Sequence, residues 1–284
     1  MNRRQALAQA RGILADNNID DATLEGEILL RHVLGINRNQ LFSDLDGSIS
    51  PAQAENLEQL LERRLSGEPS AYITGHREFY GLDFKVNRHV LIPRPESELL
   101  VEKALSLCHS HAISIIADIG TGCGAIAISL ALNLPAATIY ATDISPQALE
   151  VAKGNCRKHG VTDKVVLLQG DMLGALPEPV DLIVANLPYV REAELPGSGP
   201  LSFEPRLALN GGKDGLDRIS ILCRQAGEKL RNNGSMLLEV GQGQTQAVKA
   251  IMYESFPSAL IEIDRDLAGI ERVISLRLTQ HQIQ

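Results

Sequence analysis

The sequence predicts an α/β protein in which a doubly wound parallel sheet of seven strands follows an N-terminal helical bundle and a β-hairpin linker. From about residue 96, short apolar runs rich in β-branched residues alternate with segments of helical length, which is the pattern of βαβ units. Before about residue 75, apolar residues recur at helical spacing instead. These observations predict three parts: a helical domain over 1–75, a hairpin linker over 76–95 and an α/β domain over 96–284.

Composition indicates a globular protein with no membrane partner. Hydrophobic residues make up 44% of the 284 positions and no apolar run approaches the length of a membrane span. The first residues lack the apolar core of a signal peptide, so we expect a cytoplasmic protein. The net charge of −8 disfavours broad contact with phosphate backbones, so we expect no stable nucleic-acid partner. A monomer is the default expectation.

The four cysteines are scattered and form no Cys-x-x-Cys pair. We therefore expect free thiols, and neither disulfides nor a metal site. The cysteines are Cys108, Cys123, Cys156 and Cys223.

The N-terminal part has clear helix signals. Ser50 and Gln53 flank a predicted capping box with Pro51 at the first helical position, and Gly35 and Gly67 are expected to end helices. No polar cluster there suggests chemistry. This bundle is interpreted either as a partner-recognition domain or as a stabilising cap.

The linker is expected to contain two strands, 78–86 and 90–92, joined by a turn at 87–89. Pro93 and Pro95 then interrupt regular structure, and a helix is expected from Glu96.

The α/β domain is predicted to contain seven strands, of which the last two form a closing hairpin. Helices are expected over 125–133, over 145–159 with Ser145 as N-cap, and over 216–230. The expected strands are 114–119, 138–142, 165–169, 181–186, 235–240, 260–264 and 272–278.

Polar residues lie at the ends of four successive strands. Asp118 precedes a Gly-Thr-Gly-Cys-Gly loop at 120–124, whose glycines allow a ligand to approach the backbone closely. Asp143 ends the second strand, where an acidic residue would hold ribose hydroxyls. Asp171 follows the third, where it would accept a hydrogen bond from an adenine amino group while the next residue, a methionine, packs on the ring.

Each of these residues also has a structural explanation as a helix cap or a turn residue, but together they indicate one ligand crevice. Cys123 has no histidine near it in sequence and is interpreted as a small loop residue, not a nucleophile.

The fourth strand ends in Asn186-Leu187-Pro188-Tyr189. The Asn186 amide oxygen and the backbone carbonyl that follows would accept the two hydrogens of a planar NH2 group, and the Tyr189 ring would cover its plane. The alternative explanation is an Asx-turn with Tyr189 packed in the core.

This order of features resembles the class I S-adenosylmethionine-dependent methyltransferases, and the sheet would then be the seven-stranded methyltransferase sheet. The resemblance implies S-adenosyl-L-methionine as cofactor, S-adenosyl-L-homocysteine as product and no metal. It places the ribose on Asp143, the adenine on Asp171 and Met172, and Asn186 beside the cofactor. It gives the methionine part a cradle of Asp118, Gly120, Thr121, Gly122, Cys123 and Gly124.

The chain also resembles the HemK/PrmC family over nearly its whole length. That family methylates the glutamine side-chain amide (N5) in the Gly-Gly-Gln motif of class I peptide chain release factors, so the resemblance implies these factors as partners and assigns residues 1–75 to docking them. It implies catalysis by Asn186, Pro188 and Tyr189, and substrate binding by these three residues and Leu187. The segments that carry it are 71–75, 78–81, 92–98, 203–209, 211–216 and 238–242.

Three positions depart from that family's pattern. The first proline of Asn-Pro-Pro-Tyr is Leu187, which keeps the backbone carbonyl but loses the proline restraint on φ. Ser97 replaces a common threonine, and Ile270 stands where a polar residue is frequent.

Asn-Leu-Pro-Tyr also resembles the motif of ribosomal-RNA adenine dimethyltransferases. Three alternatives therefore stay open: an adenine amino-group methyltransferase, a glutamine methyltransferase for another protein, and a cofactor-binding protein without catalysis.

Overall fold

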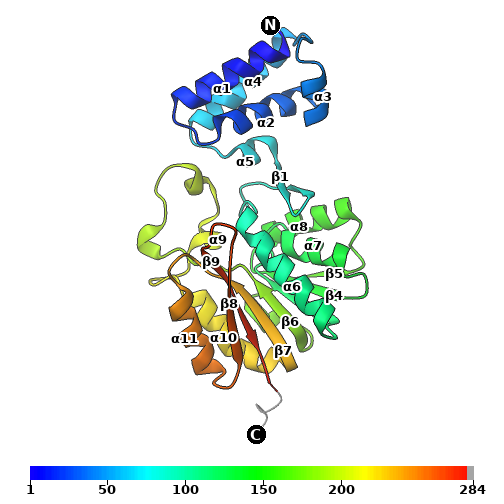
Figure 1. Ribbon diagram of the computed structural model, residues 1–284, viewed down its shortest axis with the longest axis vertical. Helices are drawn as coiled ribbons and strands as arrows, with labels where there is room; N and C mark the ends of the chain where they lie inside the picture. Colours follow the sequence, from blue (N-terminus) through cyan, green and yellow to red (C-terminus); the bar gives the residue numbers. More distant parts are fainter. Residues whose placement is uncertain (280–284) are drawn as a thin grey trace. The chain divides into compact units, whose positions relative to one another are not determined.

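The computed structural model describes residues 1–279, and the chain divides into two compact units (Figure 1). The helical unit comprises residues 1–76 together with 196–203. The sheet unit comprises residues 77–195 and 204–279. The helical unit therefore takes one short segment from the middle of the sequence. Within residues 1–279 no helix is both long and apolar enough to cross a bilayer.

The helical unit is stabilised by a leucine-rich core and by helix caps. The predicted capping box is confirmed: Ser50 Oγ accepts from the Gln53 backbone N–H, and Gln53 Oε1 accepts from the Ser50 backbone N–H. Leu14, Leu29 and Leu30 are fully buried between the helices. The helices of this unit are α1 (Arg3–Asp16), α2 (Ala22–Leu34), α3 (Arg38–Ser43), α4 (Pro51–Leu65), α5 (Ser70–Thr74) and the 3-10 helix η4 (Pro200–Phe203).

The sheet unit contains a seven-stranded sheet with the order β5-β4-β3-β6-β7-β9-β8. The first five strands in this order are parallel, whereas β9 runs antiparallel to both β7 and β8. This confirms the doubly wound sheet and its closing hairpin. The strands are β3 (Ile115–Ile119), β4 (Thr138–Asp143), β5 (Val165–Gln169), β6 (Val180–Ala185), β7 (Leu230–Glu239), β8 (Leu260–Arg265) and β9 (Glu271–Arg277).

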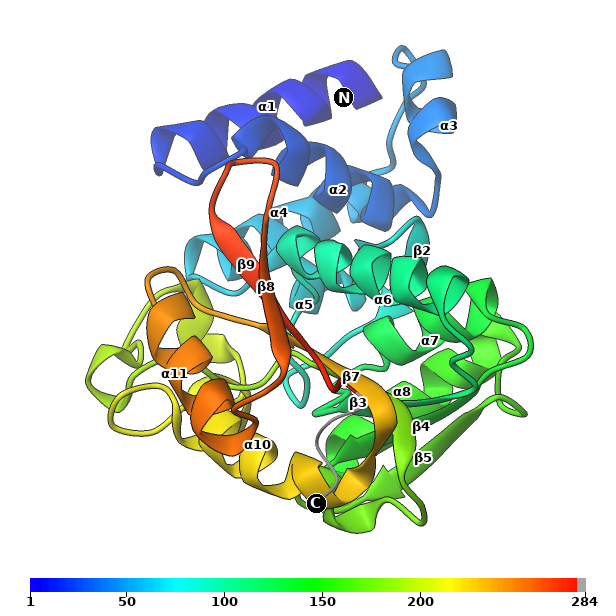
Figure 2. The ribbon, with the colours of Figure 1, turned by 60° about the horizontal axis from the view of Figure 1, so that its bottom comes forward.

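Helices cover both faces of this sheet. Helix α7 packs against α6 and α8, whereas α10 packs against α11. Figures 1 and 2 show these two groups on opposite sides of the sheet. The helices are α6 (Glu98–Ser110), α7 (Ala125–Asn133), α8 (Pro146–His159), α9 (Arg206–Leu209), α10 (Asp217–Lys229) and α11 (Thr245–Ser255), with 3-10 helices η1 (Pro95–Ser97), η2 (Met172–Ala175) and η3 (Glu192–Glu194).

The strand order reverses at β3, which fixes where a ligand can bind. Strand β3 pairs with β4 on one side and with β6 on the other, so Ile119 lies beside both Thr142 and Ala185. The connections leave in opposite directions from this point and open a crevice at the carboxyl ends of the strands. The predicted polar strand ends all belong to this edge.

The predicted position of the turn in the linker was wrong. The hairpin consists of β1 (His76–Phe79) and β2 (Leu82–Lys85), and residues 90–92 form no strand. The turn is Tyr80-Gly81, and both residues have positive φ, as a two-residue turn of type I′ requires. The backbone N–H of Tyr80 donates to Glu98 Oε1, which stabilises this conformation in a residue that rarely adopts it.

Candidate active site

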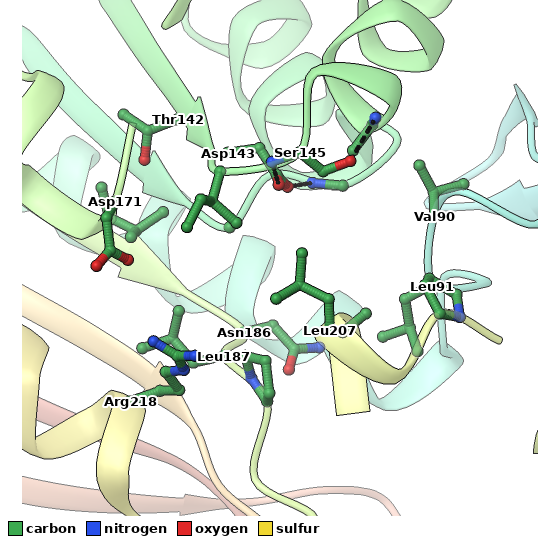
Figure 3. A pocket seen from close by; sticks show the side chains of 18 of the residues that line it. Val90, Leu91, Thr142, Asp143, Ser145, Asp171, Asn186, Leu187, Leu207 and Arg218 are labelled. Carbon is green, nitrogen blue, oxygen red and sulfur yellow. Dashed lines mark hydrogen bonds between the residues drawn. The ribbon is translucent and has the colours of Figure 1, made fainter. Parts of the chain in front are cut away.

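One pocket opens at the carboxyl edge of the sheet (Figure 3). It contains about 970 Å³ of space free of atoms, part of it open to solvent. The predicted residues that line it are Gly120, Gly122, Asp143, Asp171, Met172, Asn186, Leu187 and Pro188. The predicted residues outside its lining are Asp118, Thr121, Cys123, Gly124 and Tyr189.

The glycine loop borders the pocket between β3 and α7. Gly122 has φ +55, and a Cβ atom there would meet no atom within 4 Å, so the backbone itself faces the open space. Gly124 has a different function: a Cβ atom would lie 3.1 Å from Ile128 Cδ1 and 3.4 Å from Ala152 Cβ. The missing side chain therefore lets α7 pack closely on α8.

Asp118 lies beneath the loop and fixes its shape. Its Oδ2 accepts from Thr121 Oγ1 at 2.6 Å and from the Ala127 backbone N–H at 3.2 Å. Its Oδ1 is buried and has no hydrogen-bond partner among residues 1–279. Burial raises the pKa of Asp118 to about 7, against the lowering effect of those two hydrogen bonds.

Asp143 connects the loop to the second strand. Its two oxygens accept from the backbone N–H groups of Gly122 and Ser145, both at 2.9 Å. Burial raises the pKa of this carboxyl group, while the hydrogen bonds to Ser145 and Gly122 oppose the rise. Each oxygen keeps a second lone pair, so the carboxylate has capacity to accept hydrogen bonds from a ligand.

Asp171 and Met172 form the far side of the pocket. Asp171 is exposed and its carboxylate accepts no hydrogen bond from residues 1–279, so the carboxylate is available to a donor. Met172 is buried and has φ +50, an uncommon value for a non-glycine residue, which presents its side chain at the pocket wall.

Cys123 is 3% exposed, and burial raises the pKa of its thiol to about 12. A thiol in this state is a poor nucleophile, which agrees with its interpretation as a small loop residue.

Asn186 is oriented by two consecutive hydrogen bonds that connect it to buried side chains. Its Nδ2 donates to Ser97 Oγ at 2.9 Å, and the Ser97 hydroxyl in turn donates to Glu239 Oε2. Ser97 and Glu239 are each 3% exposed. Neither Asn186 Oδ1 nor the Leu187 carbonyl oxygen accepts a hydrogen bond from any described residue. Two acceptors are therefore available at the pocket wall, as a planar NH2 group requires.

Three neighbours hold Tyr189. Its hydroxyl donates to Glu239 Oε1 at 3.4 Å, and its backbone carbonyl accepts from Gln244 Nε2 at 2.9 Å. A Cβ atom at Gly241 would lie 2.6 Å from Gln244 Oε1 and 3.0 Å from Tyr189 Cδ2, so the missing side chain leaves room for both residues. Burial, followed by the charge of Glu239, raises the pKa of the Tyr189 hydroxyl to about 12.

The residues between Asn186 and Tyr189 are fixed by packing. Leu187 is 4% exposed within the hydrophobic core, and its Cδ2 lies 3.4 Å from the position of a Cβ atom at Gly120. This burial restrains the backbone where a proline ring would otherwise do so. The loop after α9 supports the other side, because a Cβ atom at Gly211 would lie 2.7 Å from the Pro188 carbonyl oxygen.

Some pocket residues were missed. Val90 and Leu91, expected in a strand, line the pocket from a loop. Leu207 of α9 and Arg218 of α10 line it as well. Arg218 forms no ion pair within residues 1–279, and no sequence motif singled it out. A pair of residues from two of the HemK/PrmC-like segments meets nearby: Arg94 pairs with buried Glu204, which also accepts from the Ile92 backbone N–H.

Comparison with known proteins agrees with this geometry. Residues 5–75 match a family model described as the PrmC N-terminal domain, and residues 101–188 match the ribosomal protein L11 methyltransferase (PrmA) model. A release factor glutamine methyltransferase from Moorella thermoacetica is 47% identical over 88% of this chain and 89% of that protein. Another from Bradyrhizobium diazoefficiens is 39% identical over 96% of this chain and 95% of its own length.

The chain belongs to the release factor glutamine methyltransferase family.

A solved methyltransferase from Pyrococcus furiosus shares the fold of this family member. Its TM-score is 0.53 at 17% identity, over 78% of this chain and 98% of that one. At this identity the likeness concerns the fold alone.

Proposed function

We propose that this chain transfers a methyl group from S-adenosyl-L-methionine to the side-chain amide nitrogen of the glutamine in the Gly-Gly-Gln motif of class I peptide chain release factors. Membership of the family supports the activity. The single observation of the site that supports it best is the pair of free acceptors, Asn186 Oδ1 and the Leu187 carbonyl oxygen, in one pocket wall.

The residues of the pocket fit the proposed cofactor. Asp143 and Asp171 are acceptors, which suits the hydroxyl groups of a ribose and the amino group of an adenine. The side-chain-free backbone at Gly122 leaves room for a ligand at the loop. Asp118 would act through the loop, by holding Thr121 and the start of α7. Once bound, the cofactor supplies a methyl group on a sulfonium, which is already an activated leaving group.

The chain's own residues would prepare the substrate amide for attack. An amide nitrogen is a poor nucleophile because its lone pair is delocalised into the carbonyl group. Hydrogen bonds from its two N–H groups to Asn186 Oδ1 and the Leu187 carbonyl would fix its orientation and stabilise the positive charge that develops on nitrogen. The extra proton can leave to water afterwards, so no strong general base is required.

We also propose that the helical unit, residues 1–76 with 196–203, docks the release factor. The match of residues 5–75 to the PrmC N-terminal domain supports this assignment, as does the scarcity of polar clusters suited to chemistry in that unit. The net charge of −8 favours a protein substrate over a nucleic acid, whose phosphates require a basic surface. The site of action would be the cytoplasm.

The test is a methyl-transfer assay with labelled S-adenosylmethionine on three acceptors: a purified release factor, its Gln-to-Ala variant in the Gly-Gly-Gln loop, and ribosomal RNA. We expect label on the unmodified release factor only. Label on RNA would favour adenine methylation instead, and label on both forms of the release factor would place the methyl group elsewhere.

A further inference from the structure

Building on the proposed function, we propose that Glu239, acting through Ser97, fixes the polarity of the Asn186 amide so that Oδ1, and not the NH2 group, faces the substrate. Glu239 and Ser97 are positioning residues: Ser97 contacts Asn186 and Glu239 contacts Ser97, and neither contacts the reacting atoms. The proposal assigns a function to a buried charge that the transfer step itself does not use.

The geometry connects three elements that are far apart in sequence. Asn186 follows β6, Ser97 ends the 3-10 helix η1, and Glu239 ends β7. The Asn186 side chain lies at the pocket wall (Figure 3), while Ser97 and Glu239 lie behind it and are almost fully buried. No water is needed to connect them, because the side chains are in direct hydrogen-bond contact.

The polarity follows from a count of hydrogens. A serine hydroxyl has one hydrogen, and an ionised carboxylate can only accept. Ser97 therefore donates its hydrogen to Glu239, and its oxygen is left to accept a hydrogen bond from Asn186. If the Asn186 amide turned over, its Oδ1 would face the lone pairs of Ser97 Oγ, and two acceptors would meet in a buried place. A buried contact between two acceptors leaves both without a hydrogen bond and is unfavourable.

Protonation of Glu239 would reverse the direction of the two hydrogen bonds. The carboxylic acid would donate to Ser97, the Ser97 hydrogen would turn toward Asn186, and the Asn186 amide would be stabilised with Oδ1 inward and its NH2 group toward the substrate. An NH2 group cannot accept hydrogen bonds from the N–H groups of the glutamine amide, so this form of the site would be inactive.

The groups around Glu239 set the pH range in which it becomes protonated. Burial raises the pKa of the Glu239 carboxyl group, and the charge of Glu96 raises it further. The Ser97 hydrogen bond, the positive charge of Arg272 and the Tyr189 hydroxyl lower it. Arg272 on β9 is itself paired with Asp266 at 2.9 Å. The ionised, active form is therefore lost as pH falls through a pKa that lies above the usual glutamate value.

The first experiment measures kcat and KM as functions of pH for the full chain with a release factor. In Ser97→Ala we expect kcat to fall about tenfold with little change in KM, because the acceptor that orients Asn186 is gone. Ser97→Thr keeps a hydroxyl and should recover most of the loss. Glu239→Gln cannot ionise, so the acidic limb of the kcat profile should disappear.

The second experiment needs no turnover. The side-chain NH2 resonances of Asn186, assigned by comparison with Asn186→Ala, are followed by NMR while pH is changed. In the wild type they should move with the titration of Glu239, and in Glu239→Gln they should not. The NMR measurement separates the two proposals. If the wild type fails to methylate the release factor, the proposed function is wrong. The NH2 resonances still decide the polarity of the Asn186 amide in that case.

Two control substitutions match the test variants. Ser129→Ala removes a buried hydroxyl that donates to Ala125 O within α7, and Glu262→Gln removes an exposed charge on β8 of the same sheet. Both should keep the wild-type pH profile. Unchanged kcat in Ser97→Ala, or an acidic limb that persists in Glu239→Gln, would overturn the proposal.

Discussion

The Asn186 amide nitrogen lies 2.9 Å from the Ser97 hydroxyl oxygen, although the two residues are 89 positions apart in the chain. This contact occupies the donor end of the Asn186 side chain with a protein group. The acceptor end accepts no hydrogen bond from a described residue, and both Asn186 and Leu187 line the pocket. Two acceptors on adjacent pocket-lining residues would complement a planar NH2 group.

Replacement of Asn186 by Ala should abolish methyl transfer and leave cofactor binding largely in place. The substitution removes one of two hydrogen-bond acceptors for the substrate nitrogen, and loss of a comparable group in other enzymes costs about 10²–10³ in kcat. Transfer is measured with labelled S-adenosylmethionine, and binding by calorimetry with S-adenosylhomocysteine.

The matched control for that variant is Asn133→Ala at the end of α7, where the side chain only donates to Ser129 O. It should keep full activity. Retained turnover in Asn186→Ala would contradict the mechanism, because the variant lacks the proposed side-chain acceptor for the substrate amide.

Replacement of Asp143 by Asn should weaken cofactor binding. One carboxylate oxygen becomes an NH2 group, which cannot accept from the Gly122 or Ser145 backbone N–H or from a ribose hydroxyl. Loss of a charge-assisted hydrogen bond costs about 1.5–3 kcal/mol, so the Kd for S-adenosylhomocysteine should rise about 10- to 100-fold. Calorimetry measures it directly. Asp163→Asn, an exposed change just before β5, should have no effect.

Replacement of Gly211 by Ala should impair catalysis from outside the pocket. The new Cβ atom would lie 2.7 Å from the Pro188 carbonyl oxygen and 2.8 Å from Gly215 Cα, so the loop that carries the proposed catalytic residues must shift. A displacement near 1 Å at a reacting group can lower kcat by about 10²-fold.

Gly154→Ala in α8 is the control for Gly211, since its Cβ atom would meet nothing within 4 Å. It should leave kcat unchanged and raise the free energy of unfolding by up to about 1 kcal/mol through helix propensity. Equal activity of the two variants would mean that the loop does not support Pro188.

Asp118 should make the stability of the apo protein depend on pH. Its native pKa is raised to about 7 by burial, while in the unfolded chain it is near the ordinary value of about 3.9. Between these values the native state holds a proton that the unfolded state has released. The free energy of unfolding should therefore fall as pH rises from about 4 to about 7, with a contribution of about 1.4 kcal/mol per pH unit from this group.

In Asp118→Asn this contribution disappears, because the amide does not titrate and its oxygen still accepts from Thr121 and Ala127. Urea unfolding at several pH values measures the two slopes. The variant should lose less stability than the wild type between pH 5 and pH 8, and parallel curves would show that Asp118 is ionised throughout.

The sheet could be predicted from sequence because its signals are local. The strand 165–169 was predicted at its observed bounds, and the helix 146–159 began after its serine N-cap as expected. The hairpin was misplaced because Tyr80 adopts positive φ, which its residue type does not indicate. The alternation of apolar residues continues across Tyr80 and Gly81, so the sequence predicted one strand where the structure has a turn.

The polar strand ends could be predicted from the sequence, but the side chains behind them could not. Asp143 and Asn186 stand at strand ends, where parallel topology brings them together. Ser97, Glu239 and Gln244 act through contacts across the sheet edge, and no spacing in the sequence encodes those pairings. Arg218 is the second residue of α10, and no sequence motif indicated that it would line the pocket.

The most direct test of the central claim is to locate the methyl group on the product. A purified release factor is incubated with S-adenosylmethionine and either the wild-type chain or Asn186→Ala, and the peptide that contains Gly-Gly-Gln is sequenced by mass spectrometry. The account predicts one added methyl group on the glutamine side-chain nitrogen with the wild type and none with the variant. An unmodified glutamine after incubation with an active, cofactor-binding wild type would contradict it.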